Sequence, residues 1–391
     1  MPLPGTRRTA SRWLAIARRL LEQPTAPVKE QLPQAFVRRF ARAHAALALT
    51  EDPAGNLLVK YPARGRPKCP PLVLVAHMDH PGFWIEDVAA GTASLLFKGG
   101  VGAGHARKGT RVRFFQTGRS APTGAGKLVK VTEENGRLAR ATARITQGVA
   151  RPNGFAMWDF PAFSIVNGLI VTRACDDVLG SAAALCALDE IARRRPRGVA
   201  LWGLFTRAEE IGFMGALEAV RHRLVPKGAR VLSLECSKAA GIAPQGEGVV
   251  VRVGDRASIF DPGLSEALRQ AAERARQEHP DLKYQRKLMD GGSCEATVFC
   301  AYGYRASGLA VPLGNYHNQA LVNGRPAIGP ETVNVHDFLC EVQLLVELAL
   351  HPELLGQTRG GIPDWLQERA ADARRELCEH SPSAGTGVRK K

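Results

Sequence analysis

Two histidines and an aspartate follow a short apolar run in PPLVLVAHMDHPGF, residues 70–83. Residues 72–75 predict a buried strand that ends with His77 and Asp79 on one face, because alternate side chains of a strand point the same way. An imidazole beside a carboxylate at a strand end is either a solvated strand end or a metal ligand with an orienting partner. The second interpretation requires further ligands elsewhere in the chain.

Other apolar runs also end in acidic residues or histidine. Taken alone, each group has an ordinary structural explanation, such as a helix N-cap or a solvated loop. Functional sites in open α/β sheets lie beyond the carboxyl ends of the strands, where these residues would meet. Two histidines and three carboxylates suit a pair of divalent ions with one bridging carboxylate. Where two acidic residues are adjacent, one can bind metal while the other transfers a proton or orients a ligand. The residues concerned are Asp176, Asp177, Glu209, Glu210, Glu235 and His317.

The elements that must position these residues alternate between helical and strand patterns. Helical patterns occupy about 10–22 and 32–47. After Asp177, helices are expected over 179–194, 214–224, 262–277 and 335–350, with apolar strands over 198–206, 229–235 and 306–313. Strands that are apolar throughout indicate a sheet covered on both faces. The predicted fold is therefore α/β, with a mixed, mostly parallel sheet flanked by helices.

The stretch 83–170 has a different character, with short β-rich runs separated by glycines. Asn135-Gly136 lies between two alternating runs, a strong hairpin signal. We expect a small, barrel-like all-β domain over 83–170, inserted into a discontinuous α/β domain formed by 1–82 and 171–380. Residues 381–391 are expected to be a disordered tail.

Bulk properties narrow the function further. The net charge of the 391-residue chain is +16, but aromatics make up only 6% and do not interleave with the basic residues, which argues against nucleic-acid binding. No apolar run approaches the roughly 18 residues of a membrane span. The eight cysteines show no CxxC spacing, which indicates a reducing compartment and a cytoplasmic protein. The basic start, residues 1–23, faintly resembles an organellar presequence, although a surface helix is favoured.

The motif order HxD, DD, EE, a strand-end acid and a final His resembles the clan of co-catalytic dinuclear zinc peptidases that includes the M20, M28 and M42 families. A β-rich insertion between HxD and DD is similar to M42, the glutamyl or tetrahedral aminopeptidases. The short stretch between Glu235 and His317 leaves little room for the lid of M20 enzymes. DPAGNLLVKY, WDFPAFSIVNGLIVTRACDD and MDGGSCEATVF also look like M42.

The resemblance implies a function and a role for each residue. The expected protein is an aminopeptidase with a zinc-exopeptidase-like fold, acting on peptides as a homo-oligomer. Two divalent ions would bind, Zn²⁺ by preference, with Co²⁺ or Mn²⁺ also compatible with nitrogen and oxygen ligands. Glu209 would be the general base, Asp79 would fix the tautomer of His77, and a cis peptide is expected at Asp176-Asp177. His77 and Glu235 would hold one ion, Glu210 and His317 the other, and Asp176 would bridge them.

Some positions depart from the M42 pattern around the substrate. His80 follows Asp79 where M42 has an acidic loop, Val178 replaces an arginine, and Cys294 stands where an aspartate is usual. Glu235 is one methylene longer than the usual aspartate. His80, Asp177 and Cys294 are therefore candidates for contact with the substrate or for support of the ligands. Two alternatives stay open: an M20-like amidase, deacylase or carboxypeptidase for blocked substrates, and a non-catalytic binding protein on a peptidase fold.

Overall fold

The computed structural model describes residues 7–67, 69–239, 241, 243–356 and 364–380. Its centre is an 11-stranded mixed sheet with the order β1-β2-β12-β3-β13-β16-β19-β11-β10, with β14 and β15 attached beside β16. The strands are β1 (Ala48–Glu51), β2 (Leu57–Tyr61), β3 (Leu72–His77), β10 (Ser164–Val166), β11 (Leu169–Thr172), β12 (Leu201–Thr206), β13 (Arg230–Lys238), β14 (Val249–Asp255), β15 (Tyr284–Met289), β16 (Arg305–Gly314) and β19 (Glu331–Asn334).

The middle of this sheet is parallel: β12 pairs with β3, β3 with β13, and β13 with β16. Every residue of β3 is buried. The register sets Thr206 beside His77 and Glu235 beside Ala310, so the carboxyl ends of these strands share one edge. This parallel centre, covered by helices, confirms the predicted α/β class.

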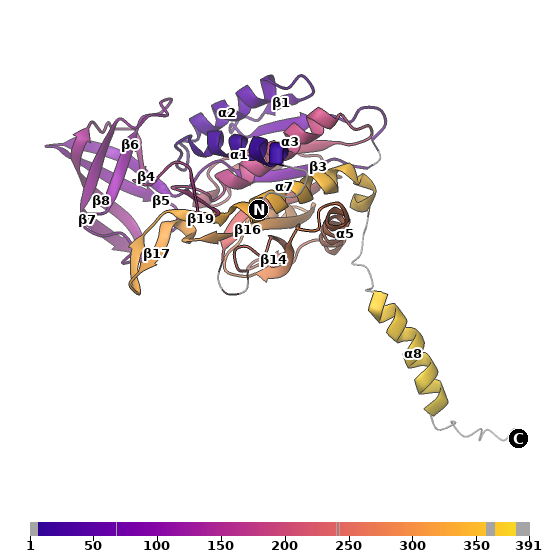
Figure 1. The fold of residues 1–391 in the computed structure, drawn as a ribbon. Helices are drawn as coiled ribbons and strands as arrows, with labels where there is room; N and C mark the ends of the chain where they lie inside the picture. Colours follow the sequence, from indigo (N-terminus) through magenta and orange to yellow (C-terminus); the bar gives the residue numbers. More distant parts are fainter. Residues whose placement is uncertain (1–6, 68, 240, 242, 357–363, 381–391) are drawn as a thin grey trace, which may run out of the picture.

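Helices cover both faces of the sheet, as the alternating side chains of β3 show. Leu72 and Leu74 pack in a core with α1 (Arg7–Leu21), α2 (Gln31–Arg42), α3 (Val178–Arg194), α5 (Pro262–Glu278) and α7 (Val335–Leu350). Val73 and Val75 pack in a second core with α4 (Met214–Arg221) and α6 (Glu295–Ala301). Figure 1 shows α1, α3 and α7 of the first layer beside the sheet.

A closed barrel with the order β4-β5-β8-β7-β6-β9 lies beside the large sheet (Figure 1). Phe83, Phe97 and Trp158 pack edge to face or tilted in its interior. Asn135 and Gly136 join β7 and β8 with φ of 51° and 74°, which confirms the predicted hairpin. The strands are β4 (Gly82–Ala89), β5 (Thr92–Lys98), β6 (Arg111–Phe115), β7 (Gly124–Glu134), β8 (Arg137–Gly148) and β9 (Phe155–Trp158).

The division into domains stays a prediction. The barrel falls inside the expected insertion, but β10 and the first residues of β11, which precede residue 171, pair in the large sheet. The expected tail, 381–391, lies outside the described residues.

The remaining elements are short or peripheral. They comprise the hairpin β17 (Gln319–Val322) and β18 (Arg325–Ile328), the 3₁₀ turns η1 (Glu209–Ile211), η2 (Tyr316–Asn318) and η3 (Pro352–Gly356), and α8 (Asp364–His380). The described side chains of α8 are exposed. Within the part of the chain that the structure covers, no helix has the length and apolar character needed to cross a membrane.

Candidate metal centre

The candidate ligands meet where the parallel strands end. His77 is the last residue of β3, and Glu235 lies near the end of β13. The other ligands come from the connections: Asp176 immediately precedes the N-cap of α3, Glu210 lies in η1 after β12, and His317 lies in η2 after β16. Five elements distant in sequence thus deliver their side chains to one edge, as the sequence analysis expects.

The ligand atoms form two clusters that share one residue. Within each cluster, one nitrogen or oxygen atom per residue lies within 4.8 Å of the others: His77, Asp176 and Glu235 form one cluster, and Asp176, Glu210 and His317 the other. The two oxygens of Asp176 face opposite histidines, with Oδ1 3.6 Å from Nε2 of His77 and Oδ2 3.4 Å from Nε2 of His317. Asp176 therefore lies between the two clusters.

Unsatisfied oxygens show that these residues fit metal ions. Oδ1 of Asp176, Oε1 of Glu210 and Oε1 of Glu235 are buried and accept no hydrogen bond from any residue that the structure describes. Burying carboxylate oxygens without partners is costly unless a cation compensates. The donors are imidazole nitrogens and carboxylate oxygens, a set that suits Zn²⁺ and also Co²⁺ or Mn²⁺.

Asp79 lies behind the ligands and holds them in place. Its two carboxylate oxygens accept hydrogen bonds from the backbone N–H groups of Glu209 at 3.0 Å and Glu210 at 3.2 Å. Its Oδ1 also lies 3.4 Å from Nδ1 of His77, and its backbone oxygen lies 3.2 Å from the same nitrogen. Asp79 thus contacts both the end of β3 and the start of η1.

Glu209 belongs to neither of the two clusters around Asp176. Its Oε2 lies 3.8 Å from Nε2 of His77, and it also groups with His77 and Glu210. Burial raises the pKa of the Glu209 carboxyl well above its ordinary value, although the charge of His77 opposes the shift. A buried carboxyl next to the ligands with a raised pKa is suited to accept and release a proton.

The titration of the other groups follows their surroundings. Burial alone would lower the pKa of both His77 and His317. The negative charges of Glu209 beside His77 and of Glu210 beside His317, together with the Asp176 carboxylate between the two rings, raise both pKa values well above the ordinary value. Burial and the nearby charge of Asp176 raise the pKa of Glu235 to about 8. Protons on these groups compensate the negative charge of the metal-free cluster, as cations would when bound.

The three substrate-side candidates support the backbone of the site. The ring of His80 contacts the backbone oxygen of Asp176 at 2.7 Å and Oδ1 of Asn318 at 3.0 Å. Asp177 caps α3 by accepting a hydrogen bond from N of Gly180, and its peptide bond with Asp176 is cis, which confirms that prediction. Cys294, the N-cap residue of α6, donates its backbone N–H to Asp255. None of the three lines the cavity at the ligands.

That cavity has a volume of about 180 Å³. Four of the candidate ligands (His77, Asp176, Glu235 and His317) and Glu209 line it, together with residues 289–293 of the stretch MDGGSCEATVF. The other lining residues were not identified from the sequence: Cys236, Ser237, Lys238, Arg252 and Tyr316. The Tyr316 ring stacks on His317 with ring centroids 3.8 Å apart. The available signal for Arg252 is a single charge inside the apolar run VVVRV of β14.

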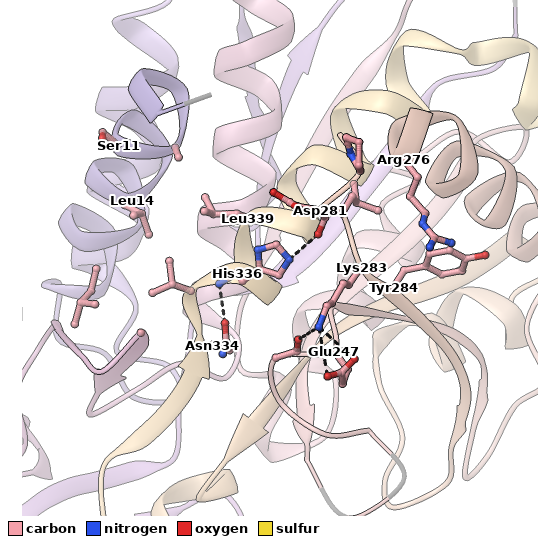
Figure 2. Close-up of a pocket in the computed structure, with 17 residues that line it drawn as sticks. Ser11, Leu14, Glu247, Arg276, Asp281, Lys283, Tyr284, Asn334, His336 and Leu339 are labelled. Atoms are coloured by element: carbon pink, nitrogen blue, oxygen red, sulfur yellow. Dashed lines mark hydrogen bonds and ion pairs between the residues drawn. The ribbon is translucent and has the colours of Figure 1, made fainter. Parts of the chain in front are cut away.

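A larger cavity, of about 1140 Å³, contains none of the ligands. Figure 2 shows it between α1, β15 and the start of α7. Some of its polar groups contact one another: Lys283 Nζ lies 3.4 Å from a Glu247 carboxylate oxygen, and His336 contacts the backbone oxygen of Asp281 at 2.9 Å. Because it contains none of the candidate ligands, this cavity is a weaker candidate for catalysis than the ligand cluster.

Comparisons with known proteins agree with this geometry. A model of the M42 glutamyl aminopeptidase family matches residues 55–325. No curated protein matches the sequence in a direct search.

Solved structures share the fold at low sequence identity. An aminopeptidase from Desulfurococcus kamchatkensis is 18% identical, with 90% of this chain and 99% of that chain covered and a TM-score of 0.72. A TET aminopeptidase from a marine sediment archaeon of the Thaumarchaeota is 18% identical (89% and 99% covered, TM-score 0.70). The TET1 peptidase of Pyrococcus horikoshii is 20% identical (87% and 99% covered, TM-score 0.67).

Proposed function

Because the chain belongs to the M42 glutamyl aminopeptidase family of peptidases, we propose that it removes N-terminal residues from peptides with a dinuclear metal centre. The observation that carries this proposal is the pair of ligand clusters that share Asp176. In this assignment His77 and Glu235 would hold one ion, Glu210 and His317 would hold the other, and Asp176 would be shared between them. When bound, two divalent ions, Zn²⁺ by preference, polarise the scissile carbonyl and lower the pKa of water.

Glu209 moves the proton in this proposal. Its carboxylate takes a proton from the attacking water and passes it to the nitrogen of the leaving amine. Such a group typically contributes about 10²–10⁴-fold to the rate. The backbone N–H of Glu209 donates to Asp79, so the same aspartate that orients His77 also sets the position of the base.

We further propose that the chain acts as a homo-oligomer in the cytoplasm. The TET1 peptidase of Pyrococcus horikoshii, which shares the fold, can assemble into a tetrahedron or a large octahedral shell. The cysteines that the structure describes outside α8 are free, as expected for a reducing compartment. The division into a catalytic domain (1–82 and 171–380) and an inserted barrel domain (83–170) belongs to the same proposal.

A peptide panel tests the activity. Short peptides with free or acetylated N-termini would be incubated with chelator-stripped protein, before and after addition of Zn²⁺, Co²⁺ or Mn²⁺, and the products identified by mass spectrometry. Stepwise loss of residues from free N-termini only, dependent on metal, is the expected result. A Glu209→Gln variant should bind metal like the wild type and lose activity about 10²–10⁴-fold.

Other outcomes would replace the proposal. Cleavage of the acetylated peptides would establish the amidase or deacylase alternative. A protein that binds two metal ions and cleaves neither set would be a binding protein on a peptidase fold.

A further inference from the structure

The ring of the candidate ligand His317 receives a hydrogen-bond partner from the barrel. Its Nδ1 lies 2.7 Å from the backbone oxygen of Gly100, in the connection between β5 and β6. Because a carbonyl oxygen can only accept a hydrogen bond, Nδ1 carries a proton and Nε2 is the nitrogen that faces the other ligands. Nε2 lies 3.2 Å from Oε1 of Glu210 and 3.4 Å from Oδ2 of Asp176. The Gly100 oxygen thus lies on the side of the ring opposite the cluster.

The loop that carries this oxygen is firmly attached to the barrel. The next residue, Val101, is fully buried in the barrel core, and its backbone oxygen accepts a hydrogen bond from N of Leu138 in β8. Ala103 donates its N–H to the backbone oxygen of Gly136, at the turn between β7 and β8. The Gly100 oxygen therefore keeps a fixed position relative to the barrel.

Two contacts on either side of Gly100 fix the same loop against the α/β unit. N of Gly102 donates a hydrogen bond to Oε1 of Gln319, in β17, at 2.8 Å. Gly99 has a φ of 112°, and a Cβ at this position would lie 2.8 Å from Cβ of Pro81, in the connection between β3 and β4. Glycine is required at position 99 because it tolerates both this backbone conformation and this close approach.

The other candidate ligands lack such a contact with the barrel. Nδ1 of His77 faces Asp79, which belongs to the α/β unit. Within the described part of the chain, no hydrogen bond joins barrel residues 82–158 to the four other ligands, which are His77, Asp176, Glu210 and Glu235. A displacement of the barrel loop should therefore affect the ion at His317 more than the ion at His77.

We propose that the barrel positions the metal ligand His317 through the backbone oxygen of Gly100, so that docking of this loop and binding of the ion at His317 and Glu210 strengthen each other. This inference rests on the proposed dinuclear centre. A partner that orients a ligating histidine typically contributes about 10–100-fold to metal affinity. Because coupling between two binding events is reciprocal, the bound ion should stabilise the docked loop by the same factor.

Titration of the metal-stripped protein with Zn²⁺, in competition with a chromophoric chelator, measures the affinity of each binding step. His317→Ala identifies the step that belongs to its cluster. Gly99→Ala displaces the loop and should weaken that same step about 10–100-fold while changing the other step by less than about threefold. Gln319→Ala removes the acceptor for N of Gly102, should weaken the same step, and carries the test if Gly99→Ala does not fold.

Hydrogen exchange measures the reciprocal effect. In the wild type, saturating Zn²⁺ should slow the exchange of the backbone amides of residues 99–103 by about 10–100-fold. In His317→Ala, which keeps the four other ligands, Zn²⁺ should leave this exchange unchanged. Gln147→Ala removes an exposed glutamine of β8 and is the matched control for Gln319→Ala. It should keep both zinc affinities and the effect of Zn²⁺ on exchange.

Equal weakening of both steps, or unchanged affinities in folded Gly99→Ala and Gln319→Ala, would overturn the inference. Equal slowing of exchange by Zn²⁺ in the wild type and His317→Ala would also overturn it. Neither measurement requires cleavage of a peptide, so failure of the inference is distinct from failure of the proposed function. Weakening of one step alone supports the inference even if no peptide is cleaved, and cleavage with unchanged affinities contradicts the inference alone.

Discussion

Asp79 is a buried carboxylate that contacts three residues of the proposed catalytic site. Its oxygens accept hydrogen bonds from the backbone N–H groups of Glu209 and Glu210, and one of them lies 3.4 Å from Nδ1 of His77. In Asp79→Asn, one oxygen becomes an NH₂ donor that faces either a backbone N–H or the imidazole. We expect kcat/KM to fall about 10–100-fold and zinc affinity to weaken.

Steady-state kinetics and metal content after dialysis would measure the effect of Asp79→Asn. Asp87→Asn, at an exposed position of β4, is the matched control and should behave like the wild type. If Asp79→Asn had full activity and bound metal normally, the hydrogen bonds at Glu209 and Glu210 would not be what positions the base.

Glu341 couples the stability of the metal-free protein to pH. Both its oxygens are buried without hydrogen-bond partners in the described part of the chain, and burial, with the charge of Glu235, raises its pKa to about 8. The folded protein therefore keeps this proton up to about pH 8, whereas the unfolded chain releases it near its ordinary value of 4.5. The associated stability is complete below the unfolded pKa and is lost as pH rises through the folded pKa.

Glu341→Gln cannot lose this proton, so its stability relative to the wild type should increase with pH. The difference in the free energy of unfolding between Glu341→Gln and the wild type should grow by up to about 1.4 kcal/mol per pH unit between about pH 5 and 8. Urea unfolding of both metal-free proteins at several pH values measures it. Glu376→Gln, at an exposed position of α8, is the control. Its free energy of unfolding should differ from that of the wild type by the same amount at every pH. If the free energies of unfolding of Glu341→Gln and the wild type changed with pH in parallel, water or a local rearrangement would be solvating the Glu341 carboxyl.

Residue types at strand ends predict the candidate ligands because each follows an apolar run whose end is easily located. His77 and Glu235 need only the direction of a parallel strand to be placed. The position of Arg252 could not be predicted in the same way. Its place in the cavity wall depends on the pairing of β14 with β16, a segment distant in sequence.

Elements with strong periodicity could be predicted, and those that depend on distant partners could not. The helices at 178–194, 262–278 and 335–350 lie close to their predicted limits. The helix expected over 32–47 ends at Arg42, because residues 48–51 extend to pair with β2. Strands β14 and β15 were not predicted, since they pair in parallel with each other at the side of β16 and carry several charged residues.

Helix α1 packs into the larger core of the α/β unit. Leu20 and Trp13 are buried in the larger core, and Arg12 pairs with Asp189 of α3. Leu20→Ala should reduce the free energy of unfolding by about 2–5 kcal/mol, because a cavity would remain next to α3. Urea denaturation measures this loss.

Arg18→Ala is the control on the exposed side of α1 and should change stability by about 0.5 kcal/mol or less. Equal stability of Leu20→Ala and the wild type would mean that α1 contributes little to the stability of the core.

At the scale of the whole molecule, the positive charge of the chain affects its self-association. The chain carries a net charge of +16, and residues 83–170 contain more than twice as many basic as acidic residues. Some of these charges, such as Lys127 and Lys130 on β7, are exposed on the barrel. If the barrels of neighbouring copies approach each other in the proposed homo-oligomer, this charge opposes assembly at low ionic strength.

Salt should therefore favour assembly, since the Debye length falls from about 10 Å at 0.1 M to about 3 Å at 1 M. Analytical ultracentrifugation from low to high NaCl should show species larger than the 42.2 kDa chain whose fraction increases with salt. Lys127→Glu combined with Lys130→Glu should shift assembly to lower salt, because it reverses charge on the barrel alone. Dissociation with increasing salt would mean that ion pairs hold the copies together, and a monomer at every salt concentration would contradict the proposed oligomer.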